Sequence, residues 1–148
     1  MPRFKNPPSD LEIKLCEVYT EHLVETSNYK GNPESREDFF LNVYQKKLAT
    51  CAVYRYLVGR GKFVSPVDFI ELPSLEGLPE LTVEGGVTIF VRPKLVGSER
   101  IITREDAVLI EKFESPKTFF AWVEFKDGLP KRFDLISTEL MQKTKRGE

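Results

Sequence analysis

The chain has 148 residues, which is the length of one ordinary domain with a core of its own. Apolar residues make up 41% and charged residues 30%, so the composition excludes a globally disordered chain. The formal net charge of −1 excludes the whole-protein basic field that is typical of non-specific DNA binders, and leaves a local basic patch open.

The sequence also bears on the compartment of the protein. No run of about 18 apolar residues occurs, so we expect no transmembrane helix and no membrane partner. Residues 1–5 lack the apolar stretch of a signal peptide. The sequence therefore predicts a cytoplasmic protein with a single domain over residues 1–148.

Cys16 and Cys51 fall in predicted amphipathic helices, where buried thiols are common, and a disulfide between them requires these helices to pair.

The front of the chain predicts an arm followed by a helix. Residues 1–8 carry three prolines, which indicates an extended arm. A capping box of Ser9 and Glu12 then begins a helix that runs to about Thr26. Apolar residues recur at helical spacing and are expected to form its buried stripe, namely Leu11, Leu15, Val18 with Tyr19, and Leu23. The acidic residues of this helix are expected to face solvent.

A second, longer helix is expected from Ser35, as its N-cap, to about Val58. Residues 28–33 form the loop before it, and the glycines of Gly59-Arg60-Gly61 end it. Its apolar face is expected to consist of Phe40, Val43, Tyr44, Leu48, Cys51 and Leu57.

The next part of the chain changes to β character. Residues 63–64 and 67–72 predict extended segments, and residues 72–80 predict a loop. Residues 81–84 and 87–91 predict a tight hairpin, because Gly85-Gly86 supplies the positive φ angles that such turns need. Pro93 is expected to end the second strand.

The rest of the chain predicts further strands and a short helix. Residues 107–113 and 118–126 are expected to form another strand pair, and Asp127-Gly128 turns the chain into a strand over residues 131–136. Ser137 is expected to cap a short helix with Leu140 and Met141 inward, and residues 143–148 to form a frayed tail.

These elements define the fold class. Helices precede strands along the chain, which favours an α+β fold over a doubly wound sheet. Short connections favour antiparallel pairing. We therefore expect two N-terminal helices packed on one face of a mainly antiparallel sheet of about six strands, with a short C-terminal helix.

Several site classes are excluded by the sequence. His22 is the single histidine, so a Ser-His-Asp triad or a Cys-His pair could not be built without this residue. No Cys-x-x-Cys motif and no phosphate-binding glycine loop occur.

One set of residues carries the chemistry of a metal site. Asp106 opens an apolar run, and Glu124 and Lys126 follow on a predicted strand, where alternation places them on one face. If the two strands pair as a hairpin, Asp106 falls near Glu124. The two carboxylates would then share a divalent cation such as Mg²⁺, and the lysine would neutralise a phosphate.

These three residues resemble the motif of the PD-(D/E)xK nuclease superfamily over residues 106–126. The resemblance implies metal-dependent cleavage of DNA, with Asp106 and Glu124 as metal ligands, Lys126 as the catalytic lysine and Mg²⁺ as the cofactor. The chain departs from the family's pattern at Glu105, where the family has proline, and at Asp127-Gly128, where the family enters a helix.

The alternative interpretation of the same residues is structural. Glu124 and Lys126 would form the solvent-facing side of a half-buried strand, and they would pair across the sheet with Arg132 and Asp134. No catalysis is implied.

Basic side chains interleaved with tyrosines suggest a nucleic-acid surface, since lysine and arginine track a phosphate backbone while aromatic rings stack on bases. The residues expected to contact nucleic acid are Lys46, Lys47, Arg55, Arg92 and Lys94. Ordinary solvated charges on a helix are the alternative.

Self-association is the last expectation from the sequence. Residues 88–91 and 119–123 are apolar on both faces of their strands, and two helices do not fully cover such a sheet. A second copy would bury the surplus. The sequence therefore predicts a non-catalytic binding or regulatory module that forms a homo-oligomer, with the nuclease as the alternative.

Overall fold

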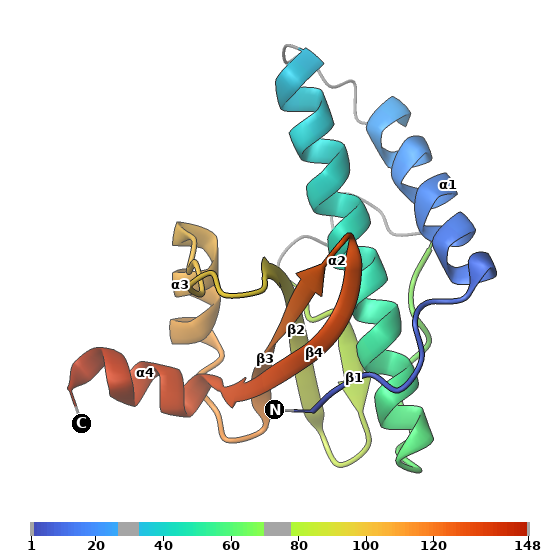
Figure 1. Cartoon of the computed structure of the whole chain (residues 1–148). Coiled ribbons are helices and arrows are strands. Elements are labelled where there is room, and N and C mark those ends of the chain that lie inside the picture. Colours follow the sequence, from blue (N-terminus) through green and yellow to red (C-terminus); the bar gives the residue numbers. More distant parts are fainter. Residues whose placement is uncertain (1, 27–32, 70–77, 148) are drawn as a thin grey trace.

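A computed structural model of the chain describes residues 2–26, 33–69 and 78–147. The helices are α1 (Asp10–Thr26), α2 (Pro33–Gly59), α3 (Arg104–Lys112) and α4 (Thr138–Arg146), and the strands are β1 (Leu81–Val83), β2 (Val87–Leu95), β3 (Thr118–Lys126) and β4 (Leu129–Ser137). The described strands form one sheet in the order β1-β2-β3-β4 (Figure 1). The α+β class is confirmed. No helix in the described ranges has the length and apolarity needed to cross a membrane.

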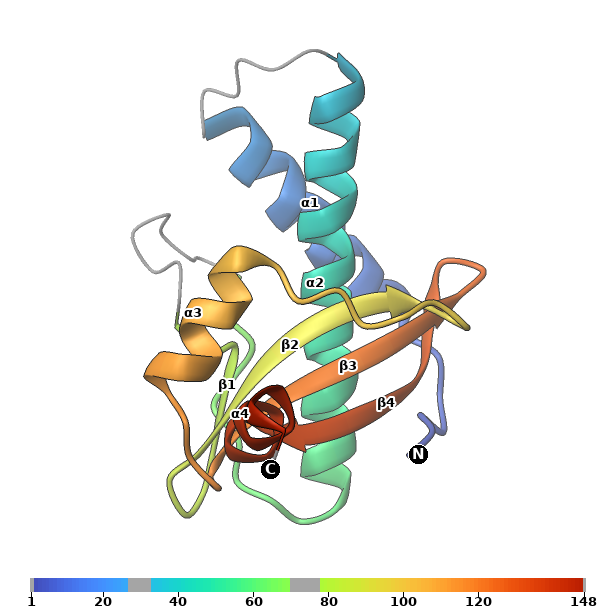
Figure 2. The same ribbon diagram turned by 90° about the vertical axis from the view of Figure 1, so that its left-hand side faces the viewer.

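The sheet separates two cores, because alternate side chains on each strand point to opposite faces. One core lies under α1 and α2 and contains Val91, Ala121 and Val123 together with Leu48 and Val53. The other core lies under α3 and α4 and contains Phe90, Phe120, Trp122 and Ile110. Figure 2 shows α2 behind the sheet and α3 and α4 in front of it. The two N-terminal helices therefore cover one face, as expected, and α3 and α4 cover the other face, which was not expected.

Helix α1 begins as predicted and buries a different side. The backbone N–H of Ser9 donates to Glu12 Oε1 over 3.0 Å and the Glu12 N–H donates to Ser9 Oγ over 3.1 Å, which confirms the capping box. The predicted buried stripe was wrong for Leu11, Leu15 and Val18, which are 69%, 40% and 50% exposed. Tyr19 is buried as predicted, and the side that packs on α2 also carries the buried residues Cys16, Thr20 and Val24.

Helix α2 begins at Pro33, two residues before the predicted cap at Ser35, and it ends at Gly59. Proline suits the first turn of a helix, where its missing N–H would have had no partner inside the helix. The loops predicted over residues 28–33 and 72–80 and the extended segment predicted over residues 67–72 lie partly outside the described residues.

The described sheet has four strands where about six were expected. Residues 63–65 run along the edge of β1 without forming a strand. Val64 makes a single bridge to Val83, and the Ser65 N–H donates to the Thr82 carbonyl. The N-terminal arm covers the other edge in the same way, since Arg3 bridges Arg132 of β4.

Residues 104–112 form helix α3, so the strand predicted over residues 107–113 was wrong. Thr103 is the N-cap, and its side chain accepts from the Asp106 N–H. A short apolar run fits a strand and a buried helix equally well by periodicity alone. Here the cap and the acidic first turn decide for the helix.

The helix α3 crossover makes β2 and β3 parallel, whereas β1–β2 and β3–β4 are antiparallel. Pro93 does not end β2, which continues to Leu95. Beyond Ile89, β1 no longer pairs with β2. The Val91 N–H points to that open edge, where it donates to Glu80, and Pro93 follows two residues later with the same orientation. Its missing N–H therefore costs no ladder bond.

The end of the chain follows the prediction in most respects. Asp127 and Gly128 turn the chain with φ angles of 54° and 78°. Ser137 caps α4 and accepts from the Leu140 N–H. Met141 packs against the second core, whereas Leu140 is 56% exposed, which corrects its inward placement. The predicted frayed tail is helical as far as Arg146.

Candidate functional site

Asp106, the first candidate metal ligand, lies in the first turn of α3 and is 3% exposed. Its Oδ1 accepts from Arg92 Nε over 2.9 Å. The same guanidinium reaches Glu80 Oε1 at 3.2 Å, and Lys46 Nζ lies 2.8 Å from that oxygen. Asp106 is therefore one end of a chain of ion pairs that joins α3, β2 and α2.

Glu124, the second candidate ligand, lies on β3 and is also 3% exposed. Arg132 Nε of β4 donates to its Oε2, and Lys94 Nζ of β2 lies 3.2 Å from its Oε1. The hydrogen bond from Arg132 lowers the pKa of Glu124, and Lys94 lowers it further, against the raising effect of burial. Glu124 is therefore ionised at neutral pH, and the charge of its carboxylate is balanced by Arg132 and Lys94.

The geometry gives the nuclease interpretation little support, although cleavage stays a prediction. Asp106 lies on a helix and Glu124 lies on a strand. Each carboxylate is bound to cationic side chains that a metal ion would have to displace. Within the described ranges, no three His, Cys, Asp or Glu side chains are grouped to hold a metal ion. Lys126 is exposed at the end of β3, next to the turn. The predicted pairing of Glu124 with Arg132 is present, on a buried side of the sheet instead of a solvated one.

The five basic residues expected to contact nucleic acid all have partners within the chain. Lys47 is buried, donates to the Asp68 carbonyl and lies 4.2 Å from the centroid of Tyr19. Arg55 Nε lies 2.9 Å from Glu12 Oε2, an ion pair without the alignment of a hydrogen bond. Lys46, Arg92 and Lys94 belong to the ion pairs described above.

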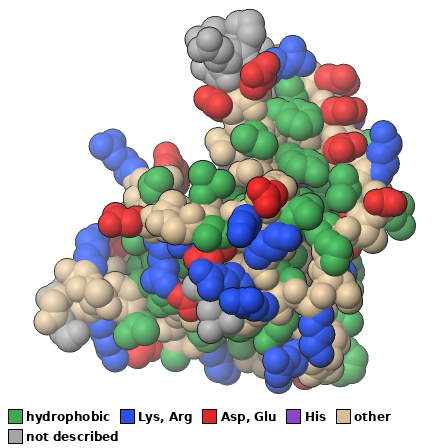
Figure 3. Space-filling view, in the orientation of Figure 1, with side chains coloured by type: hydrophobic (Ala, Val, Ile, Leu, Met, Phe, Trp, Pro, Cys, Tyr) green, Lys and Arg blue, Asp and Glu red, His purple; other side chains and the backbone are tan. Residues whose placement is uncertain are grey.

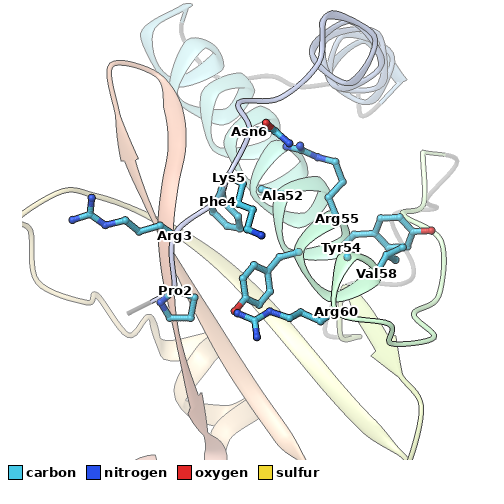
Figure 4. Close-up of a pocket in the computed structure, with 12 residues that line it drawn as sticks. Pro2, Arg3, Phe4, Lys5, Asn6, Ala52, Tyr54, Arg55, Val58 and Arg60 are labelled. Carbon is cyan, nitrogen blue, oxygen red and sulfur yellow. The ribbon is translucent and has the colours of Figure 1, made fainter.

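A groove lies beside these residues, between the N-terminal arm and the C-terminal half of α2 (Figure 4). Its volume is about 490 Å³. Lys5 from the arm and Arg60 from the end of α2 point into the space between the two segments. The aromatic residues of its wall are Phe4, Tyr54 and Tyr56.

The arm is held in place by β4, and this fixes the groove. The Phe4 N–H donates to the Lys131 carbonyl and the Phe133 N–H donates to the Pro2 carbonyl, both over 3.0 Å. The Phe4 ring stacks on Phe133 at 5.3 Å between centroids. A short arm would otherwise fray.

A second hollow of about 480 Å³ lies on the other side of the arm, against the turn between β3 and β4. Arg3, which points away from α2 in Figure 4, lines both hollows. The other basic residues around the second hollow are Lys126, Lys131 and Arg132. Asp127 is the acidic residue in the two described linings.

We call the surface formed by the two hollows together the basic groove. Its lining carries more positive than negative charge. Among the described residues, no carboxylate lies within ion-pair distance of Arg3, Lys5, Arg60, Lys126 or Lys131. Figure 3 shows Lys and Arg side chains gathered where the arm crosses the sheet, with Asp and Glu side chains along the helices above.

Sequence reasoning missed Arg3, Lys5 and Lys131 as a site. The available signal was the pair of basic residues in the arm. Nothing in their spacing connects them to Arg60.

Comparison with known protein families, with curated protein sequences and with solved structures found no match to this chain.

Proposed function

We propose that this protein is a non-catalytic binding module that holds a single strand of nucleic acid in the basic groove. The observation that carries the proposal is a set of five cations around the arm that have no acidic partner in the described part of the chain, namely Arg3, Lys5, Arg60, Lys126 and Lys131. Unpaired Lys and Arg side chains on one surface release counterions when they bind phosphates, and this release drives association.

The aromatic wall favours a single strand over a duplex. Phe4 and Tyr56 are half-buried in the wall, so the chain holds both in place while each residue keeps some exposed surface, whereas Tyr54 points away from the arm (Figure 4). Bases of a single strand stack on such rings without sequence preference, whereas bases in a duplex are already stacked. Arg60 lies over Tyr56, 5.0 Å from the ring centroid, and extends this platform with a planar cation.

The test is the binding of a fluorescently labelled single-stranded oligonucleotide, followed by anisotropy at several salt concentrations. We expect affinity to fall steeply with salt, and we expect Lys5→Glu and Arg60→Glu each to weaken binding about tenfold or more and to flatten the salt dependence. Lys145→Glu, on the exposed side of α4, makes the same charge change far from the groove and is the matched control.

Two results would count against the proposal. One is the absence of binding at low salt by a folded protein. The other is equal weakening by Lys145→Glu, since this would indicate a response to net charge instead of to the groove. A parallel incubation with Mg²⁺ or Mn²⁺ separates binding from cleavage, because the nuclease interpretation requires cutting that Asp106→Ala and Glu124→Ala abolish.

Self-association is a second candidate function. The observation that favours it is not the apolar strands that suggested it from the sequence. The strands that suggested it are covered on both faces within one chain. One uncovered apolar surface is the outer stripe of α1 formed by Leu11, Leu15 and Val18, which recur at helical spacing. If a second copy covers this stripe, Leu15→Glu converts a dimer into a monomer in light scattering after size-exclusion chromatography. A monomer at all concentrations for the unaltered chain would contradict it.

A further inference from the structure

Helices α1 and α2 bring the two cysteines together inside the protein. Cys16 and Cys51 are 0% and 4% exposed, and their Sγ atoms lie 3.9 Å apart, separated by 35 residues along the chain. Both are free thiols in this structure. Each comes from the middle of its helix, so neither belongs to a mobile end.

Contacts one helical turn to either side of the thiols fix this approach. On one side Glu12 forms its ion pair with Arg55, and on the other Lys47 lies over the ring of Tyr19. The three contacts run antiparallel along the two helices at intervals of three or four residues, which is the spacing of one helix face. The two sulfur atoms are therefore held opposite each other by the packing of α1 on α2.

The two thiols are chemically unequal. The hydrogen bond with Cys51 lowers the pKa of Cys16, and the Lys47 ammonium lowers it further, while burial opposes both. The same hydrogen bond and burial raise the pKa of Cys51 well above its ordinary value. The thiolate is the nucleophile in thiol–disulfide exchange, so Cys16 is the more nucleophilic of the two thiols while the helices are packed.

We propose that Cys16 and Cys51 are a redox-active dithiol that a low-molecular-weight disulfide converts into a covalent cross-link between α1 and α2. The Cys16 thiolate attacks one sulfur of the small disulfide, whose S–S bond breaks, and one small thiolate leaves. The Cys51 thiolate then attacks the Cys16 sulfur of the mixed disulfide, and the second small thiolate leaves. Two protein thiols are oxidised, one small disulfide is reduced to two thiols, and the two protein protons pass to the leaving thiolates.

Burial sets the conditions under which this exchange proceeds. A small disulfide reaches Cys16 only when α1 separates locally from α2, so the exchange is slow in the folded protein and rapid where the helices open. Once the mixed disulfide forms, the return of α1 to α2 places Cys51 beside it. The product is then an intramolecular bond instead of a lasting adduct.

The experiment equilibrates the full chain with oxidised glutathione, with and without urea near the unfolding midpoint, and removes the urea before analysis. We expect intact mass to show the loss of two hydrogen atoms, no bound glutathione and no alkylatable thiol. Thermal unfolding should shift upward by about 5–10 °C, because the bond closes a loop of 35 residues, and dithiothreitol should reverse the shift.

Cys16→Ala and Cys51→Ala are the matched variants, and each should give at most a glutathione adduct with no thermal shift. The proposal is overturned if the unaltered chain keeps both thiols or a stable adduct after the urea step, when access no longer limits the reaction. It is also overturned if the cross-linked chain melts below the reduced one. Neither readout involves nucleic acid, so the outcome is independent of the basic groove.

Discussion

Replacing Glu124 with glutamine tests whether this carboxylate holds the sheet together or serves chemistry. The substitution keeps the size of the side chain and removes its charge. Arg132 of β4 and Lys94 of β2 then lose the anion that lies between them, which is 3% exposed and lies near the end of β3. The loss is costly for Lys94 in particular, because water does not fully replace the carboxylate around a largely buried cation.

The magnitude follows from the two contacts. A hydrogen bond to a charged group contributes about 1.5–3 kcal/mol. The Lys94 side chain is 13% exposed and keeps this full range, whereas Arg132 is 36% exposed and solvent screening reduces its share. We therefore expect Glu124→Gln to lower the free energy of unfolding by about 2–4 kcal/mol, a large part of the total for a domain of this size.

The assay is urea unfolding at pH 7, followed by tryptophan fluorescence of Trp122, which lies in the adjacent core. The loss corresponds to a fall of about 1–2 M in the urea midpoint at an unchanged slope. Glu99→Gln is the control, since Glu99 is exposed in a loop and should move stability by less than about 0.5 kcal/mol.

An unchanged or higher midpoint for Glu124→Gln would refute this reasoning. It would also favour the nuclease interpretation, because catalytic carboxylates are commonly held in arrangements that reduce stability.

Two further predictions concern pH and the turn between β3 and β4. Because Arg132 holds the pKa of Glu124 below its ordinary value, the unfolded chain binds more protons than the folded one in the interval between the two pKa values. This contribution to stability is present above the ordinary pKa and is lost as pH falls, so the urea midpoint should drop more steeply between about pH 5 and pH 3 in the unaltered chain than in Glu124→Gln; parallel slopes would contradict it. Asp127 has a left-handed backbone with φ of 54°. Asp127→Val should therefore cost about 1–2 kcal/mol in urea unfolding while Asp127→Gly is tolerated, and equal stability of the two variants would show that the turn carries no such constraint.

The features predicted correctly from the sequence are those whose partners lie within a few residues. Ser9 and Glu12 satisfy each other across three residues, and Gly85-Gly86 and Asp127-Gly128 set their own backbone angles. Such signals do not depend on what the rest of the chain does. The end of β2 was mispredicted for the opposite reason, because whether Pro93 interrupts a sheet depends on which neighbour β2 has at that point.

Helix α1 shows why the buried side was mispredicted. Leu11, Leu15 and Val18 fall on one side, and Cys16, Tyr19 and Val24 on another, so both sides carry apolar residues. Periodicity identifies a helix with two candidate faces and does not choose between them. The choice is made by α2, through partners about 35 residues away such as Cys51 and Arg55.

The candidate site could not be predicted for a related reason. Arg3 and Lys5 line one groove with Arg60 only because Phe4 stacks on Phe133, a contact across most of the chain. The carboxylates that suggested a metal site were recognisable by their spacing. Their cationic partners were not, since Arg92 meets Asp106 only when the crossover folds as a helix.

The net charge of −1 was an argument against nucleic-acid binding, and the structure shows why the total is the wrong quantity. Three of the carboxylates form ion pairs within the protein. Glu80, Asp106 and Glu124 pair with Lys46, Arg92, Lys94 and Arg132. Of the other 20 acidic residues, five lie on α1, including Asp10 and Glu21. A phosphate at the arm responds to charges within about one screening length, roughly 8–10 Å in physiological salt. Within that range the cations without partners set the potential, so an acidic chain can present a basic surface.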